Sequence, residues 1–255
     1  MDTDDKALLE KLNRISKIRQ FQNASNAVFL IYFEDSTSMV FKPSSGERPL
    51  WDFESGSLCR REYLASQLYP KLGVHVPKSY FLEESPVGTG IIMDYLEFGE
   101  PNLVQILQLG VIPEGEWLKS FEGVTEDGKD VILWHKDSQA LRDIALADHV
   151  MNNADRKVSH IGETVSGLIA IDHGLTFHAD PKIRTFLWGW QGTELRDAEL
   201  ARLLQLEEYV TDIGLTEFIS EPEIDALTFR ITELIKSGVF PSMPTERSPL
   251  PWPIF

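Results

Sequence analysis

Apolar and polar residues alternate along several short segments in the first part of the chain, a pattern that predicts β-strands. The expected strands cover residues 17–21, 27–33, 39–42, 78–82 and 90–96. Leucines at helical spacing predict an N-terminal helix around Leu8 and Leu12 and a second helix over 57–72, which ends at Gly73. The order of these elements predicts a β-rich first lobe.

The later part of the chain has mainly helical spacing. We expect helices over 103–109, 138–151, 195–210 and from Ser220 to Gly238. Between the first two, Asp127-Gly128 predicts a tight turn in an acidic stretch, and the proline-rich tail after Phe240 predicts neither helix nor strand. The chain should therefore be α+β, with a first lobe over 1–97 and a mainly helical second lobe over 98–255.

Composition limits the possible partners. The chain of 255 residues has a formal net charge of −16 and no cluster of basic residues, so we expect no nucleic-acid partner. Cys59 is the only cysteine, which rules out an intrachain disulfide. The acidic start of the sequence and the lack of a long apolar run predict a cytoplasmic protein without a membrane partner.

Two acidic motifs suggest chemistry. Asp155 follows the helical run 141–151, and Asp172 ends the strand-like run 168–171, so a short hairpin would bring their carboxylates together. One carboxylate that accepts a hydroxyl proton and another that holds a divalent metal on nucleotide phosphates are the minimal acidic parts of a kinase. The spacing of His160 permits one metal to touch both loops, and its imidazole suits Mn²⁺ better than Mg²⁺.

Candidates for nucleotide binding lie in the first lobe. Lys42, at the end of a strand, can reach nucleotide phosphates if a helical glutamate holds it, and Glu62 is the candidate for that partner. The turn that contains Ser25 would cover the phosphates through its backbone, although a plain hairpin turn explains it equally well. The segment around Met93 and Tyr95 would offer its backbone to an adenine edge.

Several histidines near the two aspartates leave a metal-dependent phosphoester hydrolase open as an alternative. His149, His160, His173 and His178 lie close to them in sequence but lack the spacing of a dedicated metal site. We expect His135 and His149 to be structural, and Asp148 to hold the loop rather than react. Trp188 and Trp190 are expected to anchor the core; the alternative is an acceptor platform with Arg184 nearby.

The order of these parts resembles the phosphatidylinositol 3-/4-kinase-like branch of the protein-kinase-like fold, and most closely its small bacterial members. The catalytic-loop pattern Asp-Arg-His-x-x-Asn of that family is similar to residues 155–160, and its Ile-Asp-Phe-Gly is similar to residues 171–174. The resemblance implies a bilobal kinase fold with Lys42 on ATP phosphates, braced by Glu62. It also implies Asp155 as the catalytic aspartate and Asp172 on the metal.

Two positions depart from the family pattern. Lys157 replaces the loop histidine and can supply positive charge to the transferring phosphoryl group, whereas His160 replaces a metal-binding asparagine. We therefore expect an ATP-dependent phosphotransferase that uses Mg²⁺ or Mn²⁺ and acts on a protein or small-molecule hydroxyl. The alternative from another class is a pseudokinase that serves as a nucleotide-binding or scaffold module.

Overall fold

A five-stranded antiparallel sheet forms most of the N-terminal part of the chain. The structure is a computed structural model, and it describes residues 3–22 and 24–255. The strands are β1 (Ile15–Gln20), β2 (Phe29–Phe33), β3 (Ser38–Pro43), β4 (Ser79–Leu82) and β5 (Gly90–Asp94), in the order β1-β2-β3-β5-β4. All five strands were predicted from the alternation of their residues.

Two helices cover this sheet, and the alternation along each strand decides which side chain meets which helix. Leu8 and Leu12 of α1 (Thr3–Leu12) pack with Phe41 of β3, whereas Met93 of β5 clusters with Cys59 of α2 (Leu58–Leu68). Because neighbouring side chains of a strand point to opposite faces, Lys42 faces away from α1. The turn η2 (Tyr69–Leu72) extends α2 to Gly73, whose left-handed backbone ends it as predicted.

The segment that follows β5 leads into a second sheet that the sequence did not predict. It contains β6 (Val104–Gln108), β7 (Trp117–Val124) and β8 (Asp130–Lys136), in the order β6-β8-β7. The predicted helix over 103–109 is wrong, because that run pairs with β8 along its length. The tight turn is confirmed, since Gly128 has a left-handed backbone and joins β7 to β8.

Most of the helical residues lie in the second half of the chain. They form α3 (Gln139–Met151), α4 (Asp197–Asp212) and α5 (Glu221–Ser237), with the hairpin of β9 (Ile161–Thr164) and β10 (Gly167–Ala170) between α3 and α4. Short turns are η1 (Ser44–Gly46), η3 (Val158–His160), η4 (Trp188–Trp190) and η5 (Leu215–Glu217). The predicted capping box of the last helix is confirmed, since Ser220 and Glu223 bond reciprocally at its start.

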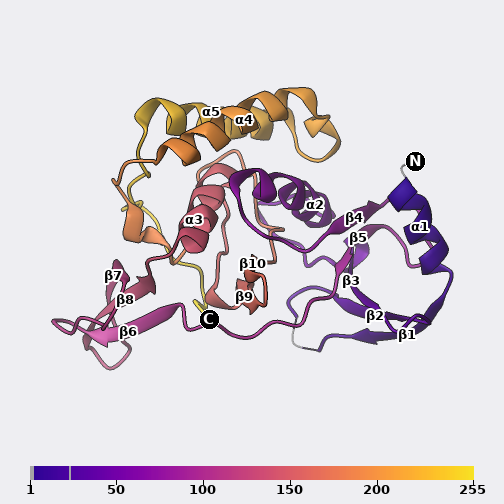
Figure 1. The fold of residues 1–255 in the computed structure, drawn as a ribbon, viewed down its shortest axis with the longest axis horizontal. Coiled ribbons are helices and arrows are strands. Elements are labelled where there is room, and N and C mark those ends of the chain that lie inside the picture. The colour runs from indigo at the N-terminus through magenta and orange to yellow at the C-terminus, as the bar shows by residue number, and fades with distance from the viewer. Residues whose placement is uncertain (1–2, 23) are drawn as a thin grey trace.

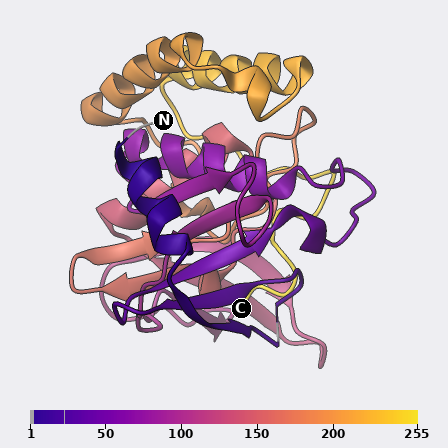
Figure 2. The ribbon, with the colours of Figure 1, turned by 90° about the vertical axis from the view of Figure 1, so that its right-hand side faces the viewer.

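The largest hydrophobic core joins α2 and η2 to the later helices. Eleven of the thirteen residues of α3 are buried, from Leu141 to Met151, and Leu64 and Leu68 of α2 belong to the same core. Helices α4 and α5 pack on one another and form a layer beside α3 (Figures 1 and 2). The α+β class is confirmed, with a β-rich N-terminal part and most helices in the C-terminal part; the lobe boundary at 97/98 stays a prediction.

Among the helices of residues 3–22 and 24–255, none combines the length and apolar composition that a membrane crossing needs.

Candidate active site

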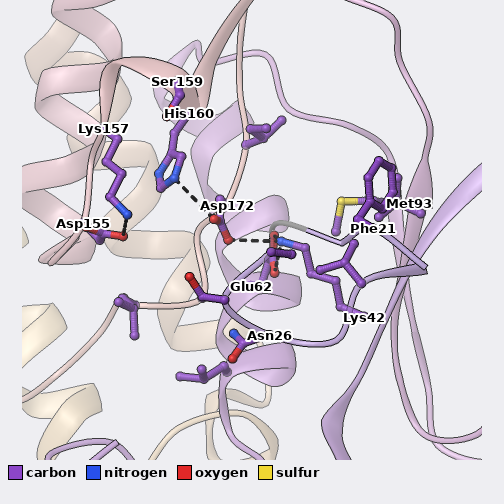
Figure 3. Close-up of a pocket in the computed structure, with 18 of the residues that line it drawn as sticks. Phe21, Asn26, Lys42, Glu62, Met93, Asp155, Lys157, Ser159, His160 and Asp172 are labelled. Atoms are coloured by element: carbon purple, nitrogen blue, oxygen red, sulfur yellow. Dashed lines mark hydrogen bonds and ion pairs between the residues drawn. The ribbon is translucent and has the colours of Figure 1, made fainter. Parts of the chain in front are cut away.

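A cleft of about 1100 Å³ lies between the N-terminal sheet and the loops around the two acidic motifs. The residues expected to bind nucleotide, to hold a metal and to transfer phosphate all line it, and Figure 3 shows Lys42, Glu62, Asp155 and Asp172 among them. These residues are Ser25, Lys42, Glu62, Met93, Tyr95, Asp155, Lys157, His160 and Asp172. Segments far apart in the sequence therefore meet here in the arrangement that their order predicted.

Lys42 is at the centre of the cleft. Its ammonium donates to both carboxylate oxygens of Glu62, at 2.6 and 2.9 Å, and to Oδ1 of Asp172 at 3.1 Å (Figure 3). Burial alone would lower the pKa of Lys42, but the carboxylates of Asp172 and Glu62 outweigh it and hold that pKa above its usual value. Burial raises the pKa of Glu62, and the Lys42 ammonium opposes this rise. Lys42 is thus a fixed positive charge in the cleft.

Asp172 lies two residues after the end of the hairpin strand β10 and has an unusual backbone. Its φ is 61°, in the left-handed region, which few residues other than glycine adopt. A hydrogen bond from Ile171 N to His160 O, 3.0 Å long, joins this segment to the loop before β9. The nearby charge of Lys42 holds the pKa of Asp172 well below its usual range, so Asp172 is a carboxylate at neutral pH. Its half-exposed side chain offers oxygen to the cleft.

Asp155 lies on the other side of the cleft, in the loop that follows α3. Its backbone N–H donates to the side chain of Asn153 at 3.0 Å, and its carboxylate pairs with Lys157 at 3.0 Å. Burial raises the pKa of Asp155, and Lys157 counteracts part of that rise. The carboxylate is therefore a better proton acceptor than a free aspartate.

The buried guanidinium of Arg156 fixes the shape of this loop. Arg156 donates to both carboxylate oxygens of Asp148, with the shortest contacts at 2.9 Å, and to the backbone oxygen of Ile171 at 3.1 Å. Tyr69 completes the network with a hydrogen bond of 2.7 Å to Asp148. The prediction that Asp148 holds the loop is confirmed. Because Ile171 immediately precedes Asp172, Arg156 also sets the spacing of the two acidic motifs.

His160 faces Asp172, with its Nε2 atom 3.3 Å from Oδ2. Burial lowers the pKa of His160 to about 4, so the ring is neutral at physiological pH. Its Nδ1 atom is buried and has no hydrogen-bond partner among the described residues. Metal-binding histidines usually donate their other ring N–H to an acceptor, so the imidazole fits a metal less well than the carboxylate of Asp172 does. Oxygen donors such as Asp172 suit Mg²⁺ together with substrate phosphates.

The other histidines near the motifs do not converge on the cleft. His149 packs against the rings of Trp188 and Phe240, and His173 lies against Tyr69 with ring centroids 4.2 Å apart. His178 bonds to the backbone oxygen of Asp52 at 2.9 Å. No group of three or more metal-binding side chains occurs in the described part of the chain. His160 is the one histidine of this group that lines the cleft, and the described residues offer no set of metal ligands for the hydrolase alternative.

Two histidine predictions concerned structure rather than chemistry. His135 is fully buried, accepts a hydrogen bond from Gly189 N at 3.0 Å, and pairs through Nδ1 with the backbone oxygen of Lys136 at 2.9 Å. Burial lowers the pKa of His135 and of His149 to about 4. Both are structural, as predicted.

The aromatic residues at the cleft differ from those that the alternative interpretation suggested. Trp188 and Trp190 are buried in the core, so they anchor it and do not form an acceptor platform. Instead Trp252 and Phe255, from the tail after Phe240, line the cleft and are exposed. They could not be predicted from the sequence, because no local pattern in a proline-rich tail shows which part of the fold the tail contacts.

Glu47 is another cleft residue that the sequence analysis missed. Its two carboxylate oxygens accept from Leu58 N at 3.1 Å and from Cys59 N at 2.8 Å, which caps the first turn of α2. Next to it, Arg48 N donates to the side chain of Asn26 at 2.8 Å and so holds the turn that contains Ser25. Asn23, in that same turn, lies outside the described residues. Glu47 lies eleven residues before the first residue of α2, so no local capping pattern in the sequence marks it.

Comparison with known proteins reveals one close relative. Protein Rv2133c of Mycobacterium tuberculosis is 32% identical over 269 aligned residues, which cover 99% of this chain and 96% of that protein. The chain belongs to the family of Rv2133c. No family model matches the sequence.

A solved structure, the proinflammatory kinase CtkA of Helicobacter pylori, is also similar to the chain. It has a TM-score of 0.43 and 12% sequence identity, and the similar regions cover 88% of this chain and 92% of that one. A similarity of this size does not by itself establish a shared activity.

Proposed function

We propose that the protein is an ATP-dependent phosphotransferase of the kinase type, most similar to the phosphatidylinositol 3-/4-kinase-like branch in its two acidic motifs. The observation that carries this proposal is the contact of Lys42 with both Glu62 and Asp172 in a cleft that also contains Asp155. A strand lysine braced by a helical glutamate is the phosphate-binding arrangement of kinases. The sequence order of these four residues is also that of the kinase parts.

The cleft residues of the N-terminal part are proposed to bind the nucleotide. Lys42 binds nucleotide phosphates, because its ammonium reaches into the cleft while Glu62 holds its position. The turn that contains Ser25 covers the phosphates, and the segment with Met93 and Tyr95 borders the adenine. Precise placement of the reacting groups supplies most of the rate enhancement in phosphoryl transfer.

The transfer itself is assigned to the loop after α3. Asp155 accepts the proton of the acceptor hydroxyl while that oxygen bonds to the γ-phosphorus and the bond to the β–γ bridging oxygen breaks, which releases ADP. Lys157 lies 3.0 Å from Asp155 and places positive charge beside the transferring group.

Asp172 would hold a divalent ion, Mg²⁺ or Mn²⁺, with His160 as the weaker second ligand. Such an ion supplies charge neutralisation on the phosphates. The carboxylate of Asp172 is ionised and open to the cleft, which supports this assignment.

A pseudokinase remains the second candidate, and two observations favour it. The ion pair between Lys157 and Asp155 occupies an oxygen of the proposed base, and His160 stands where the family pattern has a metal-binding asparagine. In this second case the protein would bind ATP without transferring its phosphate. Binding and turnover must therefore be measured separately.

Substitution of Asp155 by asparagine separates the two candidates. For an active kinase, Asp155→Asn keeps the affinity for ATP and Mg²⁺ within a few-fold but lowers phosphate transfer, including transfer to water, by about 10²-fold. Calorimetric titration measures the binding, and ³¹P NMR measures the ADP formed. The matched control is Asp180→Asn, because the Asp180 side chain is 80% exposed and lies outside the cleft.

Turnover that is equal in Asp155→Asn and the wild-type protein would remove Asp155 from the reaction. ATP binding without any turnover in the wild-type protein would favour the pseudokinase.

A further inference from the structure

The tail that follows Phe240 returns to the cleft and forms part of its wall. Thr185 N donates to Pro249 O at 3.0 Å, and Val158 N donates to Ile254 O at 2.9 Å. The second bond joins the tail to the loop between Lys157 and His160, and Figure 1 shows the end of the chain next to the β9–β10 hairpin. Hydrogen bonds therefore hold the tail in place on both sides of Trp252.

Two aromatic side chains of this tail are exposed in the cleft. Leu250 and Ile254 pack against the main core, whereas Trp252 is 84% exposed and Phe255 is 60% exposed, and both line the cleft. Prolines at 249, 251 and 253 restrict the backbone, so a ligand that binds here orders little additional chain. Rigid, exposed aromatic rings are typical anchors for ligands.

Positive charge lies beside these rings. Arg184 lines the cleft, is exposed, and forms no hydrogen bond or ion pair through its guanidinium among the described residues. Arg247 lies close by: burial, and after it the charge of Arg184, lowers the pKa of Arg247. The charge of Arg184 also acts on the carboxylate of Asp155, where it opposes the rise in pKa that burial causes, so Arg184 lies near the proposed base. A guanidinium in this position is suited to an anionic group of a ligand.

The size of the cleft leaves room for a second ligand beside a nucleotide. Its volume is about 1100 Å³, whereas pockets for single small molecules hold roughly 300–1,000 Å³. Lys42 and Asp172 mark the part of the cleft that would take the nucleotide phosphates, whereas Arg184 lies near Asp155 and lines the same cleft as the two aromatic rings. The acceptor would therefore lie inside the same cleft.

We propose that the acceptor of the phosphotransferase is a small molecule that carries an aromatic or other flat apolar group and an anionic group. The apolar group stacks on Trp252 and Phe255, the anionic group binds Arg184, and the hydroxyl lies at Asp155. This inference rests on the proposed function, since it deepens the same site.

Binding of simple probes tests the proposal without knowledge of the natural acceptor. Phenyl phosphate has both features, whereas phenol lacks the anionic group and inorganic phosphate lacks the ring. Each is titrated into the full chain that is saturated with a non-hydrolysable ATP analogue and Mg²⁺, and binding is followed by ligand-observed NMR. We expect phenyl phosphate to bind at least about tenfold more tightly than either of the other two.

Variants then assign the binding to the tail and the arginine. Trp252→Ala and Arg184→Ala should each weaken phenyl phosphate about fivefold to tenfold, while the affinity for the ATP analogue stays within about twofold of wild type. The matched controls are Trp51→Ala and Arg14→Ala: Trp51 is 92% exposed, Arg14 is exposed, and neither lines the cleft. Both controls should bind phenyl phosphate as the wild-type protein does.

The proposal is overturned if phenyl phosphate does not bind at millimolar concentration, or if it binds Trp252→Ala and Arg184→Ala as tightly as wild type. Failure of the ATP analogue to bind the wild-type protein contradicts the proposed function instead. The two failures are distinguishable because nucleotide binding is measured first.

Discussion

Loss of the ammonium of Lys42 should destabilise the protein more than loss of the charge on its partner Glu62. The side chain of Glu62 is 6% exposed and that of Lys42 is 18% exposed, so the pair is largely withdrawn from water. Lys42→Met leaves Glu62 buried without a cation, which costs about 3 kcal/mol in the free energy of unfolding at pH 7.5. Glu62→Gln leaves Lys42 in contact with Asp172 at 3.1 Å, so the cost falls to about 1–2 kcal/mol.

The double variant and the pH dependence distinguish this explanation from a simple loss of packing. Removal of both charges leaves no uncompensated ion, so Lys42→Met with Glu62→Gln should be more stable than Lys42→Met alone. Without Lys42, burial raises the pKa of Glu62 unopposed, and the folded state then binds a proton that the unfolded state releases. The cost of Lys42→Met should therefore shrink as the pH falls from 8 to 5.

Urea unfolding followed by circular dichroism measures the free energy of unfolding of the wild-type protein, the two single variants and the double variant. Lys129→Ala serves as the control, because the Lys129 side chain is 62% exposed and its partner Asp127 lies in the same turn. An equal loss of stability in Glu62→Gln and Lys42→Met, or independent effects of the two substitutions in the double variant, would show that Glu62 is not an uncompensated charge without Lys42. A pH-independent cost of Lys42→Met would show the same.

Two further predictions concern histidines. His160→Asn should raise Mg²⁺-supported ATP binding relative to Mn²⁺-supported binding, because an amide oxygen replaces the imidazole, whereas His160→Ala should weaken both. Titration of each ion measures the ratio, and an unchanged ratio across these proteins would place His160 outside the metal shell. Burial lowers the pKa of His149 to about 4 in the folded protein. Between pH 7 and pH 5 only the unfolded state therefore takes up a proton on this side chain. This should lower the free energy of unfolding by about 2 kcal/mol over that range. Urea unfolding at both pH values checks this, and an equal pH dependence in His149→Leu would assign the loss to other groups.

The sequence was sufficient for the parts of the site that depend on local patterns. Lys42 ends a strand whose alternation was visible, and Glu62 lies on a helix marked by leucine spacing. Asp155 and Asp172 follow elements that the sequence identified, so their meeting required only a short hairpin between them. The ammonium of Lys42 lies 2.6 Å from a carboxylate oxygen of Glu62 and 3.1 Å from one of Asp172, so these predicted residues do meet.

The features that the sequence did not reveal depend on contacts between distant segments. The run 103–109 has an apolar pattern that fits a short helix as well as a strand, and pairing with β8 decides in favour of the strand. Trp252 reaches the cleft only because the tail bonds to residues near 158 and 185. Arg156 was visible in the motif, but its bond to Asp148 depends on the buried end of α3.

Calorimetric titration of ATP and Mg²⁺ into the wild-type protein, Lys42→Ala and Lys129→Ala tests the central claim most directly. We expect the wild-type protein and Lys129→Ala to bind one ATP with equal affinity. Lys42→Ala should bind ATP at least about tenfold more weakly, because the phosphates lose their fixed cation. Absence of ATP binding by the wild-type protein, or equal binding by Lys42→Ala, would contradict the claim that this cleft is a nucleotide site.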